Sequence, residues 1–478
     1  MNQFRARWPD RGGFIIAVVG VSLGMGVVRQ VPVAVNGVQL LAWLVALATL
    51  VIPALVLELA IGVIFQGALS ESLRKSDKRL EVIGWLSAGV AFLALVAAGA
   101  VVGELGVSAY ESLIALIGDQ PLPWAVQPGS SAPPRHTMGS VLVAISAVMA
   151  FIDLRLWRGA PSIARTARVS LPAGLAALML LITALSARPG AIDGVARWLA
   201  PGTDGWAGLL SLGCWGQAYT YALSTWMLGL GVYAAFGSYL NRSSDVTGIT
   251  GVAVLASGLC QLLLMLTIAT ASSLSGAGAG GSAGAVVAGA IASLGAPAWA
   301  RAALATLWFA ALLAFAMPAL LALAEAVVAP IADKFRLPRE RVVAGVCLAA
   351  FFSAALVAVQ HGHAWQVDGD CLLLACAGVL TALLALSTWW QVDLDALQRH
   401  LNAYSAFRVG LGWRALVGVL VPLGATAVAL TQLVARLQQA APDRPLVAGG
   451  LHAAAAGAIL AVLVITALVV ARLPGRGA

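Results

Sequence analysis

Two glutamates stand deep inside hydrophobic segments of this 478-residue sequence. Glu58 lies in "PALVLELAIGVIFQG" (residues 53–67), and Glu104 lies in "GAVVGELGVSAY" (residues 99–110). A lone carboxylate inside a membrane is costly, so such a residue is a functional candidate by default. Both glutamates are therefore expected to accept hydrogen bonds or to take part in ion or proton movement.

A glycine pattern occurs twice in long apolar segments. "LGMG" covers residues 23–26, and "LGLG" covers residues 228–231. Matched glycine interruptions in two halves of a membrane protein indicate discontinuous helices around a binding site at the midplane. We expect the helices to unwind near 22–27 and 226–231 and to face each other. The alternative is that these glycines only let helices pack closely.

The elements that must position these residues are membrane-spanning helices. The chain is 61% hydrophobic and 10% charged, with a mean hydropathy of +0.93, and its apolar runs do not alternate. Backbone groups in a bilayer must be satisfied internally, which favours helices here. The sequence predicts an all-α polytopic membrane protein with about twelve spans, near 12–36, 38–66, 82–117, 139–157, 164–187, 207–240, 246–274, 299–333, 341–360, 370–391, 412–436 and 447–472.

The basic residues predict the orientation of these spans. With a cytoplasmic N-terminus, the inner segments hold 21 of the 28 lysines and arginines and the outer segments hold 6. Positive residues favour the cytoplasmic side. Both termini are therefore expected in the cytoplasm, with the chain in the cell inner (plasma) membrane. The net charge of +8 then reflects orientation, and we expect the lipid bilayer and a small-molecule substrate as partners, without nucleic acid.

Three stretches resemble the neurotransmitter:sodium symporter family. They are "RARWPDRGGFIIAVVGVSLGMG" (5–26), "PALVLELAIGVIFQG" (53–67) and "LGLGVYAAFGSYLNRSSD" (228–245). The resemblance implies a 5+5 inverted repeat in which helices 1 and 6 are broken. It places the first repeat at 1–188, the second at 189–391 and two accessory spans at 392–478.

The resemblance also implies roles for individual residues. In the family, a glutamate matching Glu58 bridges the broken first helix, which we favour over proton carriage, and Glu104 matches a third-span glutamate. The outer gate would be Arg29 with Asp370 or Asp368. The inner gate would consist of Arg5, Trp8, Tyr239, Glu325 and Asp333. The substrate site would surround the two glycine doublets, at Ser22, Gly24, Gly26, Leu223, Ser224, Thr225, Met227 and Gly229, although either "LSTWML" or "AYTYAL" of the sixth span fits this position.

The sequence departs from the family at both sodium sites. Side-chain oxygens of the family are replaced by Val21 and Val27 at the first site and by Pro318 and Ala319 at the second. These side chains offer no ligand oxygen. The span-three tyrosine pair that holds a substrate carboxylate becomes Gly99–Ala100. Sodium dependence is therefore doubtful, and the coupling ion is expected to be sodium or a proton.

The resulting hypothesis is a secondary-active transporter of a small organic solute, of amino-acid or amine type, that works by alternating access. A proton-coupled or uncoupled carrier is the first alternative, and a non-transporting membrane sensor or scaffold is the second. An enzyme is not expected, because the sequence contains no HExxH, P-loop or Gly-x-Ser-x-Gly motif. No cofactor or metal is expected either. His361 and His363 lie in a predicted outer loop and are read as solvated.

Overall fold

The computed structural model describes residues 7–28, 36–122, 137–202, 205–275, 283–360, 362–439 and 446–473. Side chains near some gaps, including those of 362–370, 436–439 and 446–457, lie outside the description. Every regular element in the described ranges is helical. The first half comprises α1 (Arg11–Val28), α2 (Gly37–Ala46), η1 (Leu47–Val51), α3 (Ile52–Phe65), α4 (Leu69–Ser76), η2 (Lys78–Leu80), α5 (Glu81–Ile117), α6 (Met138–Leu156), α7 (Ala160–Ser186) and α8 (Ala191–Leu199).

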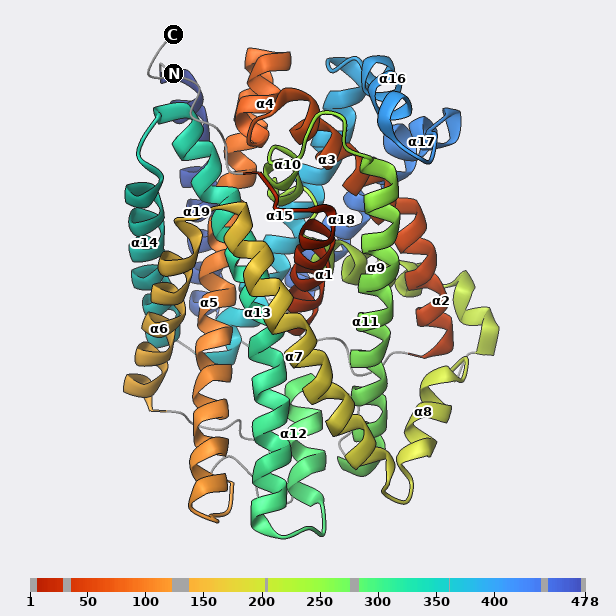
Figure 1. Ribbon diagram of the computed structural model, residues 1–478, viewed down its shortest axis with the longest axis vertical. Coiled ribbons are helices and arrows are strands. Elements are labelled where there is room, and N and C mark those ends of the chain that lie inside the picture. Colours follow the sequence, from red (N-terminus) through yellow and green to blue (C-terminus); the bar gives the residue numbers. More distant parts are fainter. Residues whose placement is uncertain are drawn as a thin grey trace.

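The second half begins with a short 3₁₀ helix and the two pieces of the sixth span. The elements are η3 (Gly205–Leu210), α9 (Leu212–Trp226), α10 (Val232–Gly237), α11 (Val246–Ser275), α12 (Ala283–Ser293), α13 (Ala298–Phe335), α14 (Arg339–Gln360), α15 (Gly362–Trp390), α16 (Leu394–Tyr404), α17 (Leu411–Ala415), η4 (Leu416–Leu420), α18 (Val421–Gln439) and α19 (Leu446–Arg472). Figure 1 shows the long helices running roughly side by side, with α4 and α16 at one end and α8 and α12 toward the other.

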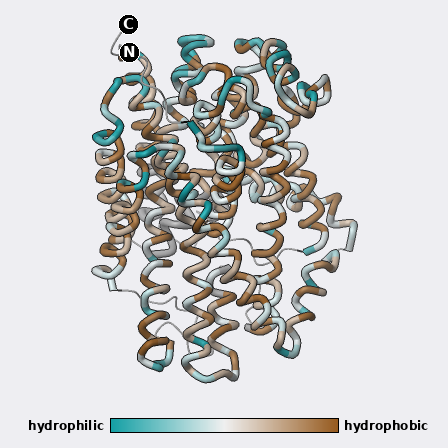
Figure 2. Tube along the Cα trace, viewed as in Figure 1, coloured by the Kyte–Doolittle hydropathy of each residue, from teal (hydrophilic) through white to brown (hydrophobic). Residues whose placement is uncertain are grey.

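Ten helical segments of the described chain are long and apolar enough to cross a membrane. The predicted sixth span is divided between α9 and α10, and the predicted twelfth span corresponds to α19. The expected all-α polytopic fold is therefore confirmed, and twelve spans are compatible with it. In Figure 2 apolar residues dominate the long helices, while hydrophilic residues gather at the end that carries α4 and α16.

Helix α13 lies at the centre of the bundle, against α1, α5 and α7. Phe315 of α13 is fully buried, and its ring packs so closely on Gly174 of α7 that a Cβ there would lie 2.5 Å from the ring. On the α1 side, Pro318 lies against Gly20. Small residues thus let neighbouring helices approach α13 closely, as is common in membrane bundles.

Helix one is not broken at the predicted residues 22–27. The α-helix continues from Arg11 to Val28, so residues 22–27 are helical, and residues 29–35 lie outside the description. A Cβ on Gly24 would overlap the carbonyl oxygen of Phe315 and would lie 2.8 Å from the Cβ of Ala319. At Gly24 the alternative interpretation of the first doublet therefore applies: glycine allows α1 to pack closely on α13.

Candidate functional site

Helix six is broken where the sequence predicts it. Helix α9 ends at Trp226 and α10 begins at Val232. Between them Met227, Gly229 and Gly231 have φ angles of +48°, +78° and +75°. Glycine adopts this left-handed region without steric cost. A Cβ on Gly229 would also lie 2.5 Å from Oγ1 of Thr381 in α15, so this position combines positive φ with close packing.

Glu58 holds the broken segment in place. Its carboxylate is buried, and Oε1 accepts a hydrogen bond of 2.5 Å from the backbone N–H of Gly229. This contact satisfies a backbone donor that the break leaves free. The described contact of Glu58 is therefore with helix six. Its bridge to the first helix stays a prediction, because residues 22–27 are helical and residues 29–35 lie outside the description.

Close packing of α10 on α3 brings Glu58 within reach of the break. A Cβ on Gly62 of α3 would overlap the carbonyl oxygen of Ala234, and one on Gly237 of α10 would lie 2.6 Å from the carbonyl oxygen of Leu59. Glycine on both helices thus permits backbone contact. The other carboxylate oxygen of Glu58, Oε2, is buried without a hydrogen-bond partner in the described part of the chain.

The predicted substrate residues lie where α1 meets α9, but their hydroxyls bond to their own helices. Ser22 Oγ donates to the carbonyl of Val19 at 3.2 Å. Ser224 Oγ and Thr225 Oγ1 both donate to the carbonyl of Tyr221 at 2.9 Å. Leu223, Met227 and Gly229 belong to the buried end of α9 and to the break, and Leu223 and Met227 are at most 2% exposed.

Gly26 differs from Gly24 in having room beside it. A Cβ on Gly26 would lie 3.7 Å from both Thr225 Cγ2 and the Tyr221 hydroxyl, which are ordinary contact distances. Tyr221 was not among the predicted site residues. The sequence pointed to Tyr221 only through the alternative stretch "AYTYAL", in which the tyrosine hydroxyl comes one helical turn before Thr225. Both "AYTYAL", through Tyr221, and "LSTWML", through Thr225, thus contribute to the wall that faces α1.

The cytoplasmic candidates form a connected network. Trp8 Nε1 donates to the carbonyl of Phe236 at 2.9 Å, and the backbone N–H of Trp8 donates to the carbonyl of Tyr239 at 3.3 Å. The Tyr239 hydroxyl in turn donates to Oε1 of Glu325, a fully buried carboxylate. The structure therefore brings Trp8, Tyr239 and Glu325 together.

Arg339, which was not among the predicted gate residues, completes this network. Its guanidinium forms an ion pair with Glu325, with Nη1 3.1 Å from Oε1, and it donates through Nε to the carbonyl of Leu156 at 3.0 Å. The position at the start of α14 was visible in the sequence, but its partner on α13 was not. Asp333 accepts a 3.1 Å hydrogen bond from the N–H of Ala68.

Several other predicted residues lie wholly or partly outside the description. Arg5 and Arg29 fall outside the described residues, and Asp370 and Asp368 lie in α15 with side chains that are not described. His361 is likewise outside, and His363 has no described side chain. Glu104 is half-buried on α5, and its backbone carbonyl accepts from Ser108 Oγ at 3.1 Å.

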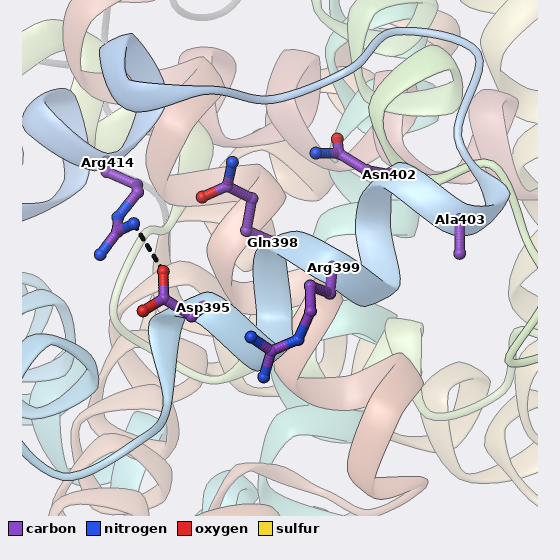
Figure 3. Close-up of a pocket in the computed structure, with 6 residues that line it drawn as sticks. All are labelled: Asp395, Gln398, Arg399, Asn402, Ala403 and Arg414. Atoms are coloured by element: carbon purple, nitrogen blue, oxygen red, sulfur yellow. Dashed lines mark ion pairs between the residues drawn. The ribbon is translucent and has the colours of Figure 1, made fainter.

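A separate pocket of about 490 Å³ opens beside α16. Figure 3 shows its polar lining, in which Arg414 pairs with Asp395. Arg399 pairs with Asp393 nearby, at 3.5 Å, so both arginines have acidic partners. The described residues contain no group of three or more histidine, cysteine, aspartate or glutamate side chains placed to hold a metal ion.

Known proteins resemble this chain along most of its length. A model of the sodium:neurotransmitter symporter family matches residues 133–473. An "uncharacterized sodium-dependent transporter" of Methanocaldococcus jannaschii is 26% identical over 452 residues, which cover 89% of each chain. The crystal structure of MhsT in complex with L-phenylalanine is similar with a TM-score of 0.73 and 20% identity, covering 90% of this chain and 100% of that one. This chain therefore belongs to the sodium:neurotransmitter symporter family.

Proposed function

We propose that this membrane symporter moves a small organic solute, of amino-acid or amine type, by alternating access. The observation that carries the proposal is the break in helix six, where Glu58 holds Gly229 inside the bundle. Discontinuous helices of this kind expose backbone groups that can hold a substrate or ion at the midplane. The family assignment and the phenylalanine-bound structural relative support the solute class.

The proposed site lies between α1 and the α9–α10 break, with the inner gate formed by Trp8, Tyr239, Glu325, Asp333 and Arg5. Arg29 and Asp370 are proposed for the outer gate. The excess of basic residues in the inner segments supports cytoplasmic termini in the plasma membrane. The repeat boundaries at 188 and 391 belong to the same proposal, with helix six opening the second repeat.

Uptake into proteoliposomes tests this function directly. We expect accumulation of at least one solute from a set of radiolabelled amino acids and amines that includes L-phenylalanine, L-leucine and phenethylamine. Uptake should require the break between α9 and α10. Gly229→Val should therefore abolish uptake, because valine strongly disfavours φ near +78°. A protein that takes up none of these solutes under sodium or proton gradients would instead fit a sensor or scaffold.

We further propose that transport does not require sodium at the two family sites. Hard cations need several oxygen ligands, whereas Val21, Val27, Pro318 and Ala319 supply no side-chain oxygen. The relative described as sodium-dependent supports the opposing view, in which hydroxyls of Ser224 and Thr225 retain a site. Sodium-specific thermal stabilisation that disappears in a Ser224→Ala/Thr225→Ala double variant would establish that opposing view.

Proton coupling through Glu58 is the second candidate. Its buried Oε2 has no partner within the described residues, which leaves one oxygen free to take a proton. Uptake should then follow an imposed pH gradient in choline chloride, and Glu58→Gln should remove that dependence. Equal uptake by Glu58→Gln and the unmodified protein across the gradient would exclude this role.

A further inference from the structure

Tyr221 places a buried hydroxyl beside the first glycine doublet. Its oxygen has no hydrogen-bond partner within the described residues. The ring lies next to that of Trp43 in α2, with centroids 6.1 Å apart. The indole Nε1 of Trp43 is also buried without a described partner. Buried polar groups are normally hydrogen-bonded, so two neighbouring exceptions need an explanation.

The Tyr221 hydroxyl lies beside Gly26 of α1. A Cβ at Gly26 would stand 3.7 Å from the hydroxyl, an ordinary contact distance, so the glycine leaves no side chain between the α1 backbone and the phenol. The nearby hydroxyls of Ser224 and Thr225 already donate to the carbonyl of Tyr221. Tyr221 is therefore the side chain on this wall that retains a hydrogen-bond donor for a ligand.

Tyr219, two residues earlier on α9, provides the contrast. Its hydroxyl lies 2.7 Å from Oγ1 of Thr49, so it is satisfied within the protein. The two tyrosines share a helix and a chemical group, but only one of them lacks an internal partner among the described residues. This difference separates a phenol that bonds within the protein from one whose hydroxyl has no partner among the described residues.

We propose that the Tyr221 hydroxyl donates a hydrogen bond to the carboxylate of an amino-acid substrate held between α1 and α9. This inference rests on the proposed transport function. The rings of Tyr221 and Trp43 are neighbours, and a phenol together with an indole N–H, which is only a donor, suits an anionic acceptor. Span three offers no tyrosine for this task, since it carries Gly99 and Ala100. A free chloride ion accepts the same kind of hydrogen bond, so the experiment must distinguish it from a substrate carboxylate.

Paired ligands and paired variants test the assignment in the full-length protein. Binding is measured by isothermal titration with L-phenylalanine and L-leucine, and with their decarboxylated analogues phenethylamine and 3-methylbutylamine. Each titration is run in sodium chloride and in sodium gluconate. The variants are Tyr221→Phe and the matched control Tyr219→Phe, and thermal unfolding without ligand reports their folding.

Tyr221→Phe should weaken amino-acid binding about tenfold or more, because a hydrogen bond to a charged group is lost. It should leave amine binding unchanged, and Tyr219→Phe should preserve the affinity for both ligand types. Without ligand, Tyr221→Phe should not lower the melting temperature, whereas Tyr219→Phe should lower it.

Unchanged amino-acid affinity in Tyr221→Phe would overturn the assignment, as would equal losses for acid and amine. A Tyr221-dependent effect that appears only when chloride is present would assign the hydroxyl to chloride and would also overturn it. Absence of binding and uptake of every solute by the unmodified protein would refute the proposed function itself, and the carboxylate contact with it.

Discussion

Gly24 and Gly26 lie two residues apart in α1 and have different surroundings. Gly24 is pressed against the backbone of Phe315, whereas Gly26 faces Tyr221 and Thr225 at ordinary contact distances. Gly24→Ala should therefore destabilise the protein by about 1–3 kcal/mol through overpacking. Gly26→Ala should fold normally and instead reduce substrate binding, because its methyl group fills the space beside the Tyr221 hydroxyl.

The two alanine variants are compared by melting temperature and by ligand affinity in the same detergent. A lowered melting temperature for Gly24→Ala together with an unchanged one for Gly26→Ala is the expected pattern. The reverse order of stability would mean that α1 packs on α13 through a different face.

Glu58 provides a second test at the residue scale. Glu58→Ala leaves the N–H of Gly229 without its acceptor, and an unsatisfied buried donor costs about 1–3 kcal/mol. Glu58→Gln keeps a carbonyl oxygen as an acceptor and should retain more stability. Thermal unfolding of the two purified variants checks this order, and identical melting temperatures would contradict the bridging role.

At the scale of elements, a buried ion pair fastens the last helix to the bundle. Lys334 of α13 lies 2.6 Å from Oε1 of Glu81 at the start of α5, and each side chain is 6% exposed. The same ammonium group donates to the carbonyls of Val470 and Ala471 at the end of α19. A cation at a helix C-terminus satisfies free carbonyls and interacts favourably with the helix dipole.

Lys334→Met should lower the free energy of unfolding by about 3–5 kcal/mol, because Glu81 then remains as an unpaired buried charge. Adding Glu81→Gln removes that charge and keeps an acceptor for the indole Nε1–H of Trp85, which donates to Oε1 of Glu81 at 3.0 Å. The double variant should therefore recover part of the loss. Unfolding in mixed micelles is measured for Lys334→Met, for Glu81→Gln and for the double variant. If the two single effects simply add up in the double variant, the pair is not coupled.

At the scale of the whole molecule, the proposed inner gate joins segments far apart in the chain. Trp8, Tyr239, Glu325 and Arg339 connect the segment before α1 with the chain just after α10, the last third of α13 and the start of α14. Asp333 ties the last turn of α13 to the N-terminus of α4. If the proposed inner gate lies here, these contacts are the ones that must break when this end of the bundle opens.

Asp333→Ala should shift the population toward a state open to the cytoplasm. A surface ion pair such as the proposed Arg5–Asp333 pair contributes about 0–1 kcal/mol directly, so the effect should appear in the conformational balance more than in stability. Reaction of a cysteine introduced at the buried Ser238 with a thiol reagent should become faster. Asp393→Ala, which removes an exposed ion pair, is the control, and equal labelling rates in both variants would refute the gate.

The sequence alone determined the class of fold, and it located the break in helix six by the same glycine pattern that it also shows in helix one. Long apolar runs with few charges leave a chain little choice but membrane helices, and a glycine at φ +78° is a local requirement. The grouping of Trp8, Tyr239 and Glu325 followed from family motifs. These features depend on local chemistry or on a recognised pattern, so no three-dimensional information was needed.

Only the tertiary structure decided what Gly24, Glu58 and Arg339 contact. The first doublet reads like the second, yet α1 stays helical because the backbone of α13 lies against Gly24. Glu58 serves helix six because α3 and α10 meet through glycines, and Arg339 pairs with a carboxylate on another helix. Partners of this kind are set by how distant segments pack, and packing depends on the shapes of both surfaces, which spacing along one segment does not encode.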